Sequence, residues 1–154
     1  MITTNFKNKI LQLITGKSKS LSGTGFCYLG LSTTTPNADG SNFTEPTAPS
    51  YSRIRLNVNA AMQYTDMWGD VVDGVVTNKT EITSSECTET GGWGEATHFG
   101  IFDTETGGVP LAFDLLTDPD GEPDENGIYP AKSLTVAYRH VAVFRVGTLQ
   151  LKLI

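Results

Sequence analysis

Hydrophobic positions near the N-terminus recur every three or four residues. In the segment TTNFKNKILQLITGKSKS these positions are Phe6, Ile10, Leu13 and Ile14. This period is typical of a helix that buries one stripe of its surface. Thr3 or Thr4 is suited to cap the first turn, and Gly16 is suited to end the helix. The pattern therefore predicts one helix within residues 1–16, too short to be stable unless it packs on a larger surface.

Beyond this helix, short apolar runs and alternating apolar and polar residues are separated by glycine, proline and asparagine, as is typical of β-strands. In YSRIRLNVN, the alternation predicts a strand with two faces: one carries Tyr51, Arg53 and Arg55, and the other carries Ile54, Leu56 and Val58. About seven or eight short strands are expected in all. They fall in the stretches GFCYLGLSTT, YSRIRLNVN, DGVVTNKTEITSS, ATHFGIFD, VPLAFDLLT, SLTVAYRHVAVFRV and GTLQLKLI.

Turn signals join these strands. The stretch TETGG predicts a hairpin, with Gly107 and Gly108 supplying positive φ, and Gly147 separates the last two strands. No helices alternate with the strands, which argues against a parallel sheet. The sequence therefore predicts an all-β fold in one domain spanning residues 1–154: an antiparallel β-sandwich, Ig-like or jelly-roll-like, with one short N-terminal helix.

The stretch GGWGEATHFGIFD raises the question of a catalytic centre. His98 and Asp103 are five residues apart, which places them on opposite faces of one strand unless Gly100 marks a bulge. The chain has no GxSxG or similar nucleophile motif. We therefore expect no catalytic residues and interpret His98 and Gly100 as structural positions on a strand. A hydrolase is the alternative, and it would need convergent titratable groups.

The tryptophan in this stretch has a structural interpretation too. Trp93 is expected to pack where the strand begins, with Gly91, Gly92 and Gly94 permitting the tight backbone around it.

Carboxylates gather in the stretch TDPDGEPDENGIYPAK. Clustered oxygen ligands suit Ca²⁺, and the candidates are Asp118, Asp120 and Asp124. The EF-hand order fails because Gly121 comes too early and a distal glutamate is missing. Prolines in this stretch exclude a regular helix or central strand. We therefore predict an exposed, mobile acidic loop without a metal or other cofactor, suited to contact a basic partner surface.

The charge of the chain argues against some classes of function. The net charge is −6, and no lysine or arginine occurs between Lys79 and Lys132. Such an acidic half would repel phosphate backbones, so nucleic-acid binding is not expected. The two cysteines, Cys27 and Cys87, lie far apart and favour neither a metal cluster nor a disulfide framework. Neither a signal peptide nor a membrane span is indicated, which favours synthesis in a reducing cytosol.

A cluster of large side chains occurs in MQYTDMWGD. Tyr64, Met67 and Trp68 are candidates for binding a partner, as are Phe6 and Ile10 of the helix. Exposed aromatic residues on loops would favour a carbohydrate-binding adhesin module that recognises the host. The alternative for this cluster is an interface or core contact.

Several segments occur in a fixed order: FCYLGLSTTTPNADGSNFTEP, YSRIRLN, VTNKTEI, GGWGEATHFGIFDTETGGVPLAF and VGTLQLKL. In this order they resemble small virion proteins of tailed bacteriophages, a group described as tail-fibre, head-fibre or capsid-decoration proteins. The resemblance covers nearly the whole chain, including NFKNKIL. The chain departs from the group in TDPDGEPDENGIYPAK, where relatives have a short turn, and in CTETGGWG. The resemblance brings no catalytic residues to this chain.

The resemblance implies a non-enzymatic structural protein of the virion, made in the cytoplasm of the bacterial host. Our main expectation is a capsid decoration or cement protein that binds the major capsid protein as a homo-oligomer. The alternative is a tail or fibre component that binds tail proteins, or the adhesin module described above.

Overall fold

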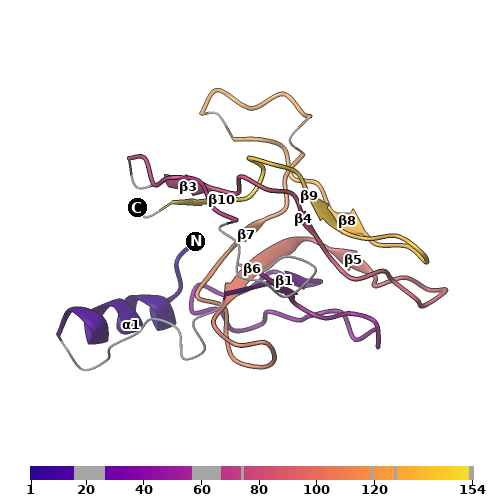
Figure 1. Cartoon of the computed structure of the whole chain (residues 1–154), viewed down its shortest axis with the longest axis horizontal. Helices are drawn as coiled ribbons and strands as arrows, with labels where there is room; N and C mark the ends of the chain where they lie inside the picture. The colour runs from indigo at the N-terminus through magenta and orange to yellow at the C-terminus, as the bar shows by residue number, and fades with distance from the viewer. Residues whose placement is uncertain (16–26, 57–66, 74, 119, 127, 153–154) are drawn as a thin grey trace.

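The computed structural model describes residues 1–15, 27–56, 67–73, 75–118, 120–126 and 128–152. These contain one helix and ten short strands (Figure 1). In chain order they are α1 (Thr4–Ile14), β1 (Tyr28–Ser32), β2 (Ile54–Arg55), β3 (Val75–Thr77), β4 (Ile82–Thr83), β5 (Glu95–Ala96), β6 (His98–Phe102), β7 (Ala112–Leu115), β8 (Leu134–Thr135), β9 (Val143–Phe144) and β10 (Gln150–Lys152). The predicted all-β class with one short helix is confirmed, whereas the Ig-like or jelly-roll-like sandwich and the single domain stay predictions.

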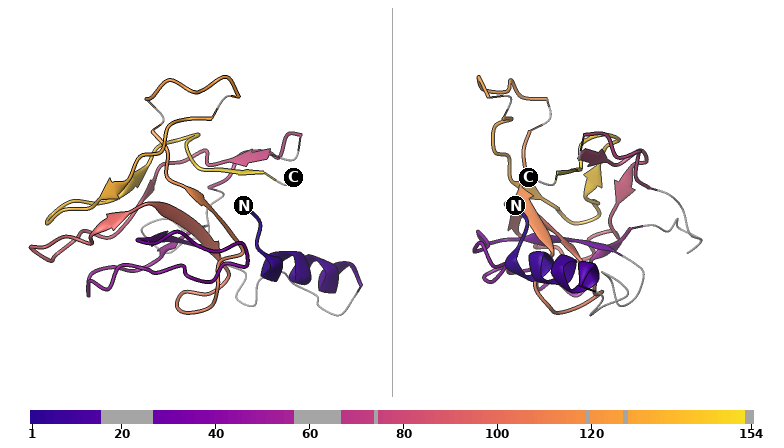
Figure 2. Two further views of the ribbon diagram at one scale, coloured as in Figure 1. Left: turned by 180° about the vertical axis from the view of Figure 1, so that it is seen from behind. Right: turned by 90° about the vertical axis from the view of Figure 1, so that its left-hand side faces the viewer.

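The strands pair in antiparallel sheets. The largest has four strands in the order β2-β1-β6-β7, and three two-stranded units pair β10 with β3, β4 with β9, and β5 with β8. The small units lie to one side of the four-stranded sheet in Figure 1, and Figure 2 gives the same arrangement from behind and from the side.

The main core lies between one face of this sheet and the smaller units. In the β1–β6 register, Leu29 lies opposite Ile101 and Leu31 opposite Phe99, so these four side chains share one face. They belong to one buried cluster with residues of the smaller units, among them Ile82. Every residue of β1 and β6 is buried, which indicates that both faces of the sheet are covered.

The β6–β7 hairpin is confirmed. The two strands pair from His98–Leu115 to Ile101–Ala112, and Gly107 and Gly108 have φ angles of 65° and 71°. The register runs without a bulge at Gly100, which lies opposite Gly30 of β1 and Phe113 of β7.

Two strand predictions were too long. SLTVAYRHVAVFRV, expected as one strand, contains β8 and β9 with a turn at Tyr138 and Arg139 between them. Arg139 adopts a φ of 61°, a backbone conformation that is rare for residues other than glycine and asparagine. Neither of these residues occurs at the turn, so the sequence did not indicate it. In the described part of YSRIRLNVN, residues 51–56, only Ile54–Arg55 is a strand, and Arg53, expected beside Arg55 on one face, is buried just before it. Val58 lies outside the described residues.

Helix α1 begins as predicted and is tied to the sheet at its start. The Thr3 hydroxyl accepts a 3.3 Å hydrogen bond from the backbone N–H of Phe6, as an N-cap does. The Thr3 backbone N–H donates to Leu111, and Ile2 forms a β-bridge with Ala112, so the chain before α1 lines the edge of β7.

Beyond this anchor, α1 projects from the body of the protein (Figures 1 and 2). Phe6 and Ile10 are half-buried and do not belong to the main core cluster. The side chains of Leu13 and Ile14, and the predicted stop at Gly16, lie outside what the structure describes. Among the described residues, no helix has the length and apolar character to cross a membrane.

Candidate functional site

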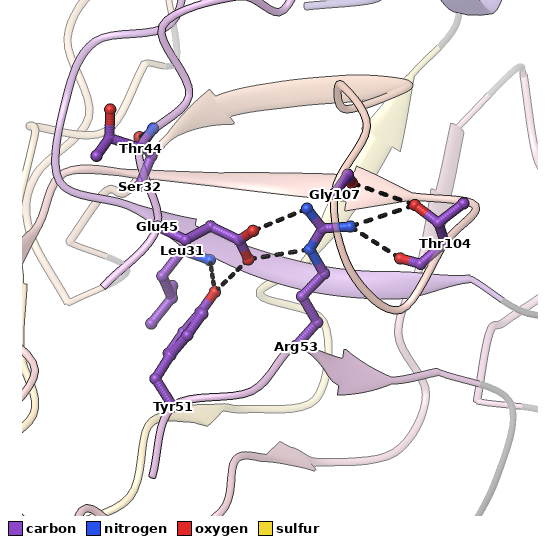
Figure 3. A network of polar contacts seen from close by, with 8 residues as sticks. All are labelled: Leu31, Ser32, Thr44, Glu45, Tyr51, Arg53, Thr104 and Gly107. Carbon is purple, nitrogen blue, oxygen red and sulfur yellow. Dashed lines mark hydrogen bonds and ion pairs between the residues drawn. The ribbon is translucent and has the colours of Figure 1, made fainter. Parts of the chain in front are cut away.

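A buried polar network lies on the second face of the four-stranded sheet (Figure 3). The guanidinium group of Arg53 donates to both carboxylate oxygens of Glu45, with N–O distances of 2.9 and 2.7 Å. It also donates to the backbone oxygen of Thr104 at 2.8 Å. Only 3% of the Arg53 side chain is exposed. This two-pronged geometry fixes the loop carrying Glu45 and the β6–β7 loop onto the sheet.

Tyr51 joins the network at the edge of β1. Its hydroxyl donates to Glu45 at 2.8 Å and accepts a 2.8 Å hydrogen bond from the backbone N–H of Leu31. The short strand β2 pairs only with Tyr28 and Leu29, so Tyr51 satisfies the next donor along this edge. Burial raises the pKa of the Tyr51 phenol, which keeps it a neutral donor.

Two facing glycines make room for this covering layer. A Cβ atom on Gly100 would lie 2.6 Å from the ring of Phe43, and one on Gly30 would lie 2.9 Å from the ring of Phe102. The rings of Phe43 and Phe102 meet edge to face, with their centres 5.1 Å apart. The Gly30–Gly100 pair therefore lets the loop around Phe43 pack flat on the sheet.

Trp93 is 4% exposed and lies two residues before β5. Its ring meets Tyr51 edge to face, and its indole N–H donates to the Ser50 hydroxyl at 2.9 Å. Gly92 and Gly94 have positive φ, and a Cβ atom on Gly92 would lie 2.7 Å from the Val136 oxygen. Trp93 therefore packs between chain segments that are distant in sequence.

Ser50 links Trp93 to a carboxylate. Its hydroxyl donates to Glu89, and its backbone N–H donates to the same carboxylate at 3.1 Å. These hydrogen bonds, the one from the Ser50 side chain first, lower the pKa of Glu89. Because the hydroxyl proton of Ser50 is engaged with Glu89 and no histidine base faces it among these contacts, the cluster works as a structural link.

His98 and Asp103 have separate partners. The Nδ1 atom of His98 lies 2.8 Å from the hydroxyl of Thr97, and burial lowers the pKa of the imidazole while the charge of Asp114 opposes that shift. Asp103 follows the end of β6 and forms an ion pair with Lys9 of α1. The Asp103 contact thus joins the end of β6 to α1, whereas the His98 contact is with the preceding residue.

The predicted partner-binding cluster is only partly at the surface. Met67 is 8% exposed and belongs to the main core, so its expected role in binding a partner is corrected to core packing. Trp68 is half-buried, packs against that core and forms a β-bridge with Asn78. Tyr64 lies outside the described residues. The backbone oxygen of Met67 accepts a hydrogen bond from the N–H of Lys79, which places the residue beside the turn after β3.

Asn78 is a structural residue that the sequence did not indicate as one. Its side-chain amide donates to Thr80 and Arg145 at 2.9 and 2.8 Å, and its side-chain oxygen accepts from the N–H of Leu149 at 2.9 Å. Only 1% of Asn78 is exposed. It thereby holds the turn after β3 to the segment between β9 and β10. In the sequence it stands out only as part of an NKT turn.

The acidic stretch forms a projecting hairpin, which we call the acidic finger and define as residues 117–131 (Figure 1). Thr117 and Ala131 form a β-bridge at its base, and the N–H of Asp124 donates to Ile128 near its tip. The predicted exposure is confirmed. These backbone contacts join the two sides of the finger among its described residues, and the expected mobility stays a prediction.

The candidate calcium ligands point to different partners. Asp118 forms a 2.9 Å ion pair with Lys132, which lowers the pKa of its carboxyl. Asp124 accepts hydrogen bonds from the backbone N–H groups of Asn126 and Ile128, and these lower its pKa. Asp120 lies 3.5 Å from Arg145. Within the described part of the chain, no three histidine, cysteine or acidic side chains gather as a metal site would require.

A shallow groove of about 340 Å³ lies at the base of the finger. Phe99, Leu116 and Phe144 contribute apolar walls, while Lys132 and Arg145 stand at its margin. Both of these cations face carboxylates of the finger, as described above.

These features define a β-rich protein whose buried polar and charged groups hold its own loops in place. The family described as podophage GP4 fiber I protein gp80 matches residues 1–137. The chain belongs to this family and is a structural protein of a bacteriophage virion. None of the curated proteins compared with the chain matches it. The family description favours the tail or fibre alternative over the capsid-decoration reading.

The last seventeen residues, 138–154, lie beyond the matched part. They carry β9 and β10, which supply the pairing partners of β4 and β3. Two strands of the matched part, β3 and β4, therefore pair with strands that lie outside it.

Proposed function

We propose that the protein is a non-enzymatic fibre component of a tailed-phage particle, assembled from several copies and attached to other tail proteins. The observation that carries this proposal is the family match over residues 1–137. We further propose that it is made in the cytoplasm of the bacterial host and then incorporated into the virion.

The contacts of the described residues support a structural role. The buried guanidinium group of Arg53 is paired with the carboxylate of Glu45, and the His98 ring is hydrogen-bonded to the adjacent Thr97. A hydrolytic enzyme would instead direct such groups toward a common point in a cleft. The burial of Met67 also removes one of the residues on which the adhesin alternative depended.

Immunogold electron microscopy of intact particles tests the proposal. Antibodies raised against the recombinant chain should label fibres or the tail region, and particles lacking the gene product should show no label. Labelling spread evenly over the capsid surface would overturn the fibre assignment in favour of decoration. Particles without the chain, purified in the same way, provide the control for antibody specificity.

A further inference from the structure

Positive charge is concentrated in and after α1. The first 38 residues contain four lysines, at positions 7, 9, 17 and 19, and no aspartate or glutamate. On the helix, Lys7 is exposed, and Lys9 is paired with Asp103. Leu11 is 59% exposed, which is unusual for a leucine on a helix packed inside a protein. Lys17 and Lys19 lie outside the described residues, so among the described residues the outer side of α1 offers the positive charge of Lys7 and the apolar side chain of Leu11.

The acidic finger has the opposite charge and a similar apolar component. Its fifteen residues contain five carboxylates and no lysine or arginine. Glu122 and Glu125 are exposed, and so are Ile128, at 62%, and Tyr129, at 43%, on the returning side of the hairpin. Exposed apolar side chains on a projecting arm are suited to contact another surface.

These two surfaces lie at different ends of the molecule. In Figure 1 the finger rises at the top and α1 lies in the lower part, and both views of Figure 2 keep that separation. Screening by salt weakens attraction between exposed charges over distances beyond about 10 Å. The finger and α1 of one copy are therefore placed to attract other molecules.

We propose that the outer side of α1 in one copy binds the acidic finger of a second copy. This inference rests on the proposed function, because it names the surfaces that join the copies of an assembled fibre component. The contact is heterologous: it joins two different patches, so each copy offers one patch to each neighbour. Opposite charges bring the surfaces together and orient them, while Leu11 packs with Ile128 and Tyr129.

Two charge-reversed variants test the contact. The helix variant is Lys7→Glu, and the finger variant combines Glu122→Lys with Glu125→Lys. The finger variant leaves Asp118 and Asp124 in place, so the ion pair with Lys132 and the hydrogen bonds at the tip remain. A matched control, Glu81→Lys with Glu86→Lys, makes the same charge change at two exposed positions outside the proposed contact.

Sedimentation velocity of the purified full chain measures association. We expect the wild type and the control to sediment faster as protein concentration rises at about 20 mM salt, and to sediment as monomers at about 500 mM salt. Each charge-reversed variant alone should stay monomeric at low salt, because like charges then face each other. An equimolar mixture of the two should associate again, since every contact in the mixture can be charge-matched.

A wild type that stays monomeric at low salt and high concentration would overturn the inference. So would variants that associate as the wild type does, or a mixture of the two variants that stays monomeric. Circular dichroism and melting temperatures establish that each variant is folded before it is compared. These outcomes are independent of gold labelling on particles, so a failed contact between copies and a failed fibre assignment are told apart.

Discussion

The guanidinium carbon of Arg53 lies 3.4 Å from the centre of the Phe102 ring. The cation is thus stacked on a ring of β6 while its edge binds Glu45, and the Arg53 side chain is sheltered from water. Stacking of this kind and a two-pronged ion pair both depend on the flat shape of the guanidinium group.

Replacing Arg53 should therefore destabilise the fold. Arg53→Ala leaves Glu45 without its partner and uncovers Phe102, and we expect the free energy of unfolding to fall by about 2–4 kcal/mol. The partial exposure of Glu45 to water keeps this loss below that of a fully buried ion pair. Arg53→Lys, which keeps the charge but not the flat fork, should lose less than Arg53→Ala. Urea denaturation followed by circular dichroism measures both, and a lysine variant as stable as the wild type would show that charge alone suffices.

A second prediction concerns the close packing at the Gly30–Gly100 pair. Gly100→Ala places a methyl group 2.6 Å from Phe43 and should cost about 1–3 kcal/mol through displaced packing. The control is Gly91→Ala, where a Cβ atom meets nothing within 4 Å and the change should stay within about 0.5 kcal/mol. Adding Phe43→Leu to Gly100→Ala should recover part of the loss. Purely additive effects in this double-mutant cycle would argue against the clash.

Asn78 should be one of the most sensitive polar positions. Asn78→Ala removes hydrogen bonds to Thr80, Arg145 and Leu149 in a buried setting, and each is worth about 1 kcal/mol. Asn8→Ala, at an exposed position of α1, is the matched control and should have little effect on global stability. Thermal unfolding compares the two. Equal melting temperatures for both variants would show that water replaces the lost bonds.

The buried histidine predicts a dependence of stability on pH. Because burial lowers the pKa of His98, the unfolded chain takes up a proton more readily than the folded chain. The free energy of unfolding should therefore fall as pH drops below about 6.5, the ordinary histidine value, and level off below the pKa of the folded state.

The variant His98→Gln should flatten this part of the curve. Urea titrations between about pH 7.5 and 5 measure it, and His140→Gln, at the exposed second histidine, is the matched control for removing an imidazole. The carboxyls of Asp118 and Asp124 have lowered pKa values and affect the free energy of unfolding only below about pH 4, outside this pH range. A slope that survives in His98→Gln would assign the dependence to another group.

The sequence was sufficient to predict those elements that are determined by residues close together in the chain. The apolar runs of β1 and β6 and the glycines of the β6–β7 turn follow from neighbouring residues and were predicted where they are observed. The cap of α1 was predicted at Thr3 or Thr4, and the structure has it at Thr3. The turn at Arg139 was missed because a positive φ at arginine has no sequence signal and is imposed by the pairing of β8 and β9 with different partners.

The roles of individual side chains were harder to predict, because they depend on residues that are distant in sequence. Arg53 looked like an exposed strand residue, and only the folded loop that carries Glu45 explains its burial. Asn78 is recognised as structural only once Leu149, 71 residues away, is placed beside it. Met67 looked like part of a binding cluster until the core around it was known.

The two ends of the acidic finger lie side by side. The N–H of Asp118 donates to Pro130, and the N–H of Lys132 donates to Leu116, so the chain leaves and rejoins the sheet region at nearly one point. A segment closed in this way can change its length or sequence at little entropic cost to the rest of the molecule. Substitutions and insertions in the finger should therefore disturb the folding of the rest of the chain little, so that the contacts of the finger with other molecules can be altered separately from the stability of the fold.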